Sequence, residues 1–161
     1  MIKVGIFGVG MVGGALLRYF EKRPNFEIHF YDKKGLGSFD DLNRADFIYI
    51  CLPTPYVPDI GCDISIIDEA VGSLIGNKVV IIKSTVPPGT TFILQQKYPQ
   101  HKFLFNPEFF KHLSQRRLVF NPDSKLMLSV LLRVEKYKKK GFEISNSELL
   151  QLTLRLSTLK F

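Results

Sequence analysis

Three glycines near the start of the chain have a spacing that suits phosphate binding. Gly8, Gly10 and Gly13 form the pattern G-x-G-x-x-G. Gly8 permits a tight turn, Gly10 lets the backbone approach a pyrophosphate, and Gly13 allows a helix to pack closely on a strand. Asp32 lies 19 residues after Gly13, where a carboxylate can hold the hydroxyls of an adenosine ribose. Together these residues predict a dinucleotide site, whereas the glycines alone would also fit a turn in another α/β protein.

The residues around Asp32 bear on which dinucleotide binds. A carboxylate at this place repels the additional phosphate of NADP and therefore favours NAD. Lys33 and Lys34 follow directly, and basic residues in such a loop either accept a phosphate or remain solvated in a turn. The predicted cofactor is NAD. The residues predicted to contact it in this part of the chain are Gly8, Gly10, Met11, Val12, Gly13, Asp32 and Lys34.

The segments that must position these residues alternate between strand and helix patterns. Short apolar runs indicate buried strands, and longer amphipathic stretches indicate helices. This alternation predicts an α/β fold, a Rossmann-like doubly wound parallel sheet of five or six strands. The predicted strands are residues 2–7, 26–31, 47–52, 78–83 and 102–105, with 126–132 as a candidate sixth. The predicted helices are residues 11–22 and 63–75, the second with Asp63 as its N-cap.

Composition divides the chain near residue 123. Residues 1–123 carry 14 Lys and Arg against 12 Asp and Glu, a net charge of +2, whereas residues 124–161 carry 8 against 3, a net charge of +5. All nine prolines lie at or before Pro122. We therefore expect an NAD-binding Rossmann domain over residues 1–123 and a basic, Leu-rich C-terminal extension over residues 124–161. The excess charge is too local to predict a nucleic-acid partner.

Composition also bounds the class of protein. The content of 45% hydrophobic and 23% charged residues is that of a globular chain. No apolar run reaches the roughly 18–20 residues of a membrane span. Cys51 and Cys62 supply neither a disulfide framework nor a four-ligand zinc site, so no metal is expected. The expectation is a soluble, cytoplasmic protein that does not bind a membrane.

Three further motifs follow predicted strands, at the end of the sheet where open α/β folds form their ligand crevice. They are I-C-L-P-T-P at 50–55, K-S-T-V-P-P-G-T-T at 83–91 and F-N-P-E-F-F at 105–110. With the glycine loop and G-C-D-I-S at 61–65, they resemble the N-terminal NAD-binding domain of the nucleotide-sugar dehydrogenases, the UDP-glucose/GDP-mannose 6-dehydrogenase family. The resemblance covers about residues 1–123.

The resemblance implies an activity and a set of site residues. Members of this family oxidise the C6 alcohol of a nucleotide sugar to a carboxylate with two NAD molecules in succession, through covalent intermediates on a cysteine. By resemblance, Thr85 positions the sugar or a water, and Glu108 takes part in acid/base chemistry. The structural alternatives are a helix N-cap for Thr85 and a surface turn residue for Glu108. The other matched positions are Pro53, Thr54 and Ser84 along the cofactor crevice, and Phe109 and Phe110 along the nucleotide sugar.

The resemblance also implies binding partners. UDP-glucose is the expected nucleotide sugar, and a homodimer is left open because relatives dimerise through a helix that follows the matched part.

The chain departs from the family in three places. The link between the second and third predicted strands, residues 33–46, is compact. His112 occupies a position where relatives often carry a second glutamate. The G-x-C-x-x-K-D loop with the nucleophile is not found among the 161 residues. Cys51 ends a predicted strand, and Cys62 precedes a predicted helix on a different loop, so neither is expected beside the reacting carbon.

The leading prediction is the NAD-binding part of a UDP-glucose 6-dehydrogenase-like oxidoreductase. It is not expected to complete the reaction by itself, because a thioester route needs a positioned thiolate. The first alternative is a non-catalytic dinucleotide-binding module whose tail binds a partner. The second is a hydroxy-acid dehydrogenase, which shares the glycine loop but not the motifs at 83–91 and 105–110. A truncation, a frameshift and a genuine short form all fit the change in composition after residue 123.

Overall fold

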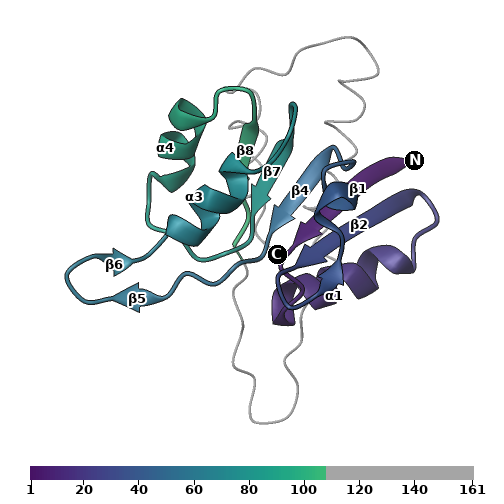
Figure 1. The fold of residues 1–161 in the computed structure, drawn as a ribbon, viewed down its shortest axis with the longest axis horizontal. Helices are drawn as coiled ribbons and strands as arrows, with labels where there is room; N and C mark the ends of the chain where they lie inside the picture. The colour runs from purple at the N-terminus through teal and green to yellow at the C-terminus, as the bar shows by residue number, and fades with distance from the viewer. Residues whose placement is uncertain (108–161) are drawn as a thin grey trace, which may run out of the picture. The chain divides into compact units, whose positions relative to one another are not determined.

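The structure, a computed structural model, describes residues 1–107. They form a six-stranded sheet in the order β3-β2-β1-β4-β7-β8 and a hairpin that pairs β5 with β6 (Figure 1). The strands of the sheet are β1 Ile2–Phe7, β2 Phe26–Asp32, β3 Leu36–Gly37, β4 Phe47–Ile50, β7 Val79–Ile82 and β8 Lys102–Phe105. The hairpin consists of β5 Tyr56–Val57 and β6 Gly61–Cys62. The helices are α1 Met11–Glu21, α2 Phe39–Leu42, α3 Ser65–Gly72 and α4 Thr90–Lys97.

Part of what the sequence predicts lies outside the described residues. This holds for the candidate strand at 126–132, the boundary at residue 123 and the extension over 124–161. It also holds for the predicted site residues Glu108, Phe109 and Phe110 and for His112. Their predicted roles stay predictions.

The central strands are parallel and buried on both faces. β1 pairs in parallel with β2 and β4, and β7 pairs in parallel with β4 and β8, whereas the short β3 is antiparallel to β2. All four residues of β4 and all four of β7 are buried. Near-continuous apolar runs form such strands because helices cover both faces of a parallel sheet. No helix within residues 1–107 is long and apolar enough to cross a membrane.

Helices pack on opposite faces of the sheet, which confirms the doubly wound prediction. On one face, Phe20 of α1 packs against Tyr49 of β4, with ring centroids 5.7 Å apart. On the other face, Ile48 and Ile50 of β4 belong to a buried cluster with the remaining helices. That cluster includes Leu42 of α2, Ile67, Ala70 and Val71 of α3, and Leu94 of α4. Successive residues of β4 therefore contribute to two different cores.

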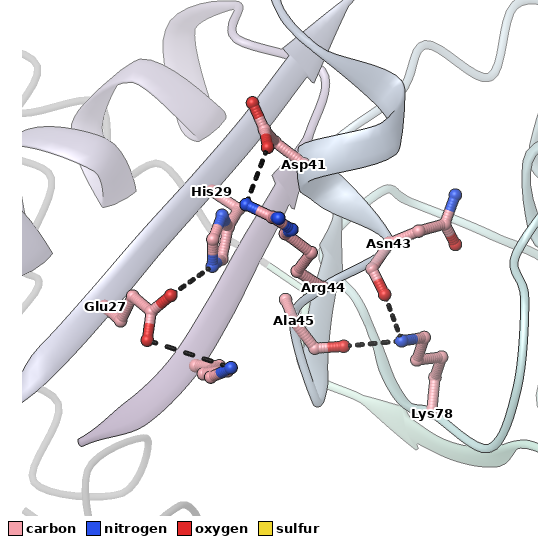
Figure 2. Close-up of polar contacts among 8 residues, drawn as sticks. Glu27, His29, Asp41, Asn43, Arg44, Ala45 and Lys78 are labelled. Atoms are coloured by element: carbon pink, nitrogen blue, oxygen red, sulfur yellow. Dashed lines mark hydrogen bonds and ion pairs between the residues drawn. The ribbon is translucent and has the colours of Figure 1, made fainter.

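The compact link between β2 and β4 is a structured unit. Gly37 has a φ of +71°, and a Cβ at this position would collide with the carbonyl of Phe30, so the turn back along β2 requires glycine. After α2, the Lys78 Nζ donates hydrogen bonds to the carbonyls of Asn43 and, at 2.8 Å, Ala45 (Figure 2). A cation at these carbonyls complements the negative end of the helix and ties the link to the start of β7.

The prediction for the helix near residue 63 is wrong in its details. The helix extends from Ser65 to Gly72, and its N-cap is Ile64, which makes no side-chain capping bond. Asp63 lies one residue earlier, where its Oδ1 accepts the backbone N–H of Ser65 at 2.8 Å. This local turn, rather than a cap, holds the side chain, and the hydrogen bond lowers the pKa of the Asp63 carboxyl.

Two elements have no clear signal in the sequence. In α4, Phe92 and Ile93 are exposed, so its apolar residues do not gather on one face as in an amphipathic helix. The strands β5 and β6 have two residues each, which is too short for an alternating pattern. The strand β5 follows the motif at 50–55, and α4 begins within the motif at 83–91.

Candidate functional site

The order of strands reverses beside β1, which creates a crevice at the carboxyl end of the sheet. The chain passes from β1 to β2 on one side and later to β4 on the other. Hydrogen bonds continue the sheet past the carboxyl ends of β1 and β4. The Gly8 N–H donates to the Tyr31 carbonyl, and the Cys51 N–H donates to the Phe7 carbonyl, each at 2.8 Å. Open α/β sheets bind ligands at such a reversal of strand order.

The three glycines of the loop meet different local requirements. Gly8 has a φ of +92°, and a Cβ there would lie 2.6 Å from the carbonyl oxygen of Cys51. A Cβ on Gly13 would collide with the carbonyl of Gly8, so only glycine allows α1 to start this close to β1. By contrast, no atom lies within 4 Å of the position that a Cβ on Gly10 would occupy. Gly10 therefore leaves open space beside the N-terminus of α1, as the approach of a pyrophosphate requires.

A cavity of about 740 Å³ opens in front of this loop. This volume is in the range of small-molecule and cofactor sites. The glycine loop and α1 contribute one wall, the end of β2 a second, the segment after β4 a third and α3 a fourth. The predicted residues that line it are Gly8, Gly10, Met11, Val12, Asp32, Lys34 and Pro53. The lining residues that were not predicted are Phe7, Tyr31, Lys33, Phe39, Cys51, Leu52, Ile66, Glu69, Ala70 and Ser73.

Asp32 connects two walls of the cavity. Its Oδ2 accepts the backbone N–H of Val9 at 2.8 Å, and its Oδ1 accepts the backbone N–H of Lys34 at 2.9 Å. The hydrogen bond from Lys34 and then that from Val9 lower the pKa of the Asp32 carboxyl, which favours the ionised form. A carboxylate has about four lone-pair sites, so Asp32 can still accept ribose hydroxyls.

Ser84 and Thr54 join the loops that follow β4 and β7. The buried Ser84 hydroxyl accepts the Leu52 N–H at 3.0 Å and donates to the Leu52 carbonyl at 2.6 Å. The Thr54 hydroxyl donates to the carbonyl of Thr85 at 2.7 Å. Neither Ser84 nor Thr54 lines the cavity, and neither does Gly13. The predicted contact of these three residues with the cofactor stays a prediction.

Thr85 lies exposed beyond the end of β7. It is not the N-cap of a helix, because α4 begins at Thr90 and its N-cap is Gly89. Next to it, the buried Lys83 donates from Nζ to the Asn106 Oδ1 at 2.7 Å, which ties the end of β7 to the end of β8. The motifs at 83–91 and 105–110 thus begin side by side, although the sequence assigned no role to Lys83.

Cys62 lies closer to Thr85 than the sequence indicates. The β5–β6 hairpin pairs Tyr56 with Cys62 and folds the loop back on itself. The Cys62 Sγ is therefore 3.5 Å from the carbonyl oxygen of Thr85 and 3.8 Å from that of Thr54. Cys51 lines the cavity instead. Both cysteines are half-buried thiols outside any disulfide, and Cys62 precedes α3 as predicted. The contact of Cys62 with the Thr85 carbonyl was not predicted.

Comparison with known proteins identifies the family. Residues 37–127 match the UDP-glucose/GDP-mannose dehydrogenase family, NAD binding domain. The match covers more than half of the chain, and the chain belongs to this family. NAD is accordingly its cofactor, and the glycine loop, the open space at Gly10 and the carboxylate of Asp32 fit that dinucleotide.

Individual relatives are much longer than this chain. The chain is 35% identical over 69 residues to UDP-N-acetyl-D-mannosamine dehydrogenase of Methanocaldococcus jannaschii, a stretch that is 38% of this chain and 16% of that protein. The GDP-mannose dehydrogenase structure from Pseudomonas aeruginosa is similar with a TM-score of 0.49 and 17% identity, over 67% of this chain and 36% of that one. The UDP-glucose dehydrogenase structure from Pyrobaculum islandicum is similar with a TM-score of 0.48 and 21% identity, over 69% of this chain and 37% of that one.

Proposed function

We propose that this chain is the NAD-binding part of an enzyme that oxidises the C6 alcohol of a UDP-sugar, with UDP-glucose as the first candidate. The observation that carries the proposal is the set of hydrogen bonds that joins the ends of β4 and β7 beside the cofactor cavity. Through Ser84 and Leu52, and through Thr54 and Thr85, these bonds hold two family motifs together at the carboxyl end of the sheet. The relative from M. jannaschii, named for a UDP-sugar, supports the UDP group.

The residues of the chain have distinct proposed tasks. The free N–H groups at the start of α1 bind the pyrophosphate, and Asp32 holds the adenosine ribose. Bound NAD supplies the hydride acceptor for the oxidation of the alcohol. The hydroxyl of Thr85 orders a substrate oxygen or a water, Glu108 transfers a proton, and Phe109 and Phe110 run along the nucleotide sugar. The 161 residues do not supply the G-x-C-x-x-K-D loop, so we expect no sugar acid from this chain alone.

A chimaera tests the proposal. Residues 1–123 of this chain would replace the corresponding part of the M. jannaschii dehydrogenase, and NADH formation would be followed with UDP-N-acetyl-D-mannosamine and with UDP-glucose. We expect turnover with a UDP-sugar that Thr85→Ala lowers by about tenfold or more, as loss of a positioning hydroxyl should. A folded chimaera that binds NAD but oxidises neither sugar would contradict the proposal.

A non-catalytic dinucleotide-binding module is the second candidate. It is favoured because neither Cys51 nor Cys62 belongs to a motif for the family's nucleophile. This candidate predicts that the chimaera binds NAD and remains inactive, which is the outcome that contradicts the first.

A further inference from the structure

The cavity lies at the carboxyl ends of β1, β2 and β4, on one side of the crevice. Its walls come from the segments after β1, β2 and β4 and from α3, whereas no described residue after β7 lines it. A pyrophosphate at the glycine loop and a ribose at Asp32 leave the region beyond Asp32 for the base attached to that ribose. The wall of this region that α3 provides is therefore positioned to contact the base.

One face of α3 and its C-cap lines this region. Ile66, Glu69, Ala70 and Ser73 recur at the spacing of neighbours on a single helix face. Ile66 and Ala70 provide apolar surface against which a flat base can pack. Glu69 is exposed, and its carboxylate forms no hydrogen bond or ion pair with residues 1–107. A charged acceptor thus stands beside an apolar surface.

The polar atoms on this wall are hydrogen-bond acceptors. An ionised carboxylate has no proton to donate. The Ser73 hydroxyl gives its proton to the carbonyl of Ala70 at 2.7 Å, so its oxygen offers lone pairs to any other group. Adenine carries an amine with two donors on C6, whereas guanine and hypoxanthine carry an acceptor oxygen at C6 and a donor N–H at N1. Acceptors that face C6 are complementary to the amine of adenine and opposed to the C6 oxygen of a 6-oxopurine.

We propose that Glu69, with Ser73 as a second acceptor, selects the exocyclic amine of adenine in the dinucleotide. The inference rests on the NAD site of the proposed function and adds a specificity-determining residue to it. Selection has two causes: the carboxylate accepts a hydrogen bond from the amine, and it repels a carbonyl oxygen in the same position.

The test compares two dinucleotides that differ only at C6 and N1 of the base. The full 161-residue chain is titrated calorimetrically with NAD and with nicotinamide hypoxanthine dinucleotide, in which a carbonyl oxygen replaces the amine. We expect NAD to bind about fivefold more tightly, as for one partly solvated hydrogen bond to a charged group. In Glu69→Gln the ratio should fall to about one, because an amide can turn either a donor or an acceptor toward the base.

A matched variant completes the design, and circular dichroism checks that each variant is folded. Glu21→Gln removes a charge from an exposed residue of α1 outside the cavity and should keep the preference for NAD. Equal affinities of the unaltered chain for the two dinucleotides would overturn the proposal but leave the cofactor site intact. A preference for NAD that survives in Glu69→Gln would do the same. If the folded chain binds neither dinucleotide, the cofactor site itself and the proposal both fail.

Discussion

The carboxylate of Asp32 reaches from the end of β2 to the glycine loop, where it accepts the N–H of Val9 at 2.8 Å. The residue predicted to hold a ribose therefore also fixes the loop predicted to hold a pyrophosphate. The second oxygen, which accepts the N–H of Lys34, sets the path of the chain after β2. Ribose and pyrophosphate sites are thus joined through one side chain.

Asp32→Ala should affect both binding and folding. Two backbone N–H groups lose their acceptor, so we expect the free energy of unfolding to fall by about 1 kcal/mol. The affinity for NAD should fall by about tenfold or more, because the ribose contact and the fixed loop are both lost. Calorimetric titration measures the affinity and urea denaturation the stability. Unchanged binding by the variant would contradict the role of Asp32.

The stability difference between the unaltered chain and Asp32→Ala should depend on pH. The pKa of Asp32 is lowered from its ordinary value of 3.8 by the hydrogen bonds from Lys34 and Val9. A carboxyl with a lower pKa in the folded state adds stability above its unfolded pKa, and this contribution is lost as the pH falls toward the folded pKa. Urea denaturation should show a constant difference above about pH 5 and a smaller one below about pH 4. A difference that grows on acidification would have the wrong sign.

Gly10 and Gly13 should respond differently to substitution. Gly10→Val places a side chain in open space, so stability should change by less than about 0.5 kcal/mol while NAD binding is lost. Gly13→Ala brings a Cβ into collision with the carbonyl of Gly8, so the free energy of unfolding should fall by about 2 kcal/mol or more. Urea denaturation and NAD titration of the two variants provide the comparison. Equal losses of stability would show that the cavity at Gly10 is closed in solution.

The choice between NAD and NADP should depend on the residues at the end of β2. We expect NAD to bind about tenfold more tightly, because the ionised Asp32 opposes a second negative charge at the ribose. Asp32→Ser should narrow this preference, since Lys33 and Lys34 line the same cavity and can accept a phosphate. Adding Lys34→Ala to Asp32→Ser should restore part of the preference for NAD over NADP. Titration of each variant with both dinucleotides gives the ratios.

The hydroxyl of Ser84 should matter more for stability than that of Thr54. Ser84 is buried, and Ser84→Ala leaves the Leu52 N–H without its acceptor. The free energy of unfolding should therefore fall by about 1–2 kcal/mol. Thr54→Val removes a donor to the carbonyl of Thr85, an exposed residue that water can reach, so the cost should stay below about 0.5 kcal/mol. Chemical denaturation of both variants decides whether the loops depend on Ser84.

The full chain should not form a sugar acid from NAD and UDP-glucose. Aldehyde oxidation needs a thiolate at the aldehyde carbon, and neither cysteine lies in the family's nucleophile motif. Mass spectrometry would detect UDP-glucuronate. If it appears and survives Cys51→Ser combined with Cys62→Ser, the thiolate mechanism fails for this chain. If Cys62→Ser alone abolishes it, the thiol beside Thr85 is the nucleophile, and the expectation that Cys62 lies away from the reacting carbon is wrong.

The parallel strands were predictable because each is a short apolar run between breakers, and the motifs after them mark their carboxyl ends. Asp32 was predictable as a ribose ligand from its distance to the glycine loop, but its bonds to Val9 and Lys34 were not. The face of α3 with Glu69 could not be assigned, because its direction depends on how the helix packs on the sheet. The contact between Cys62 and Thr85 could not be predicted, because two-residue strands leave no periodic signal.

The order of strands has a consequence for synthesis on the ribosome. β2 pairs with β1, β3 with β2, β4 with β1, β7 with β4 and β8 with β7, so each strand joins one that has already been made. Translation delivers residues in this same order, so each described strand of this sheet after β1 emerges when a partner has already been made. The nascent sheet can grow outward from β1 strand by strand, which limits the time during which an apolar strand is exposed without a neighbour.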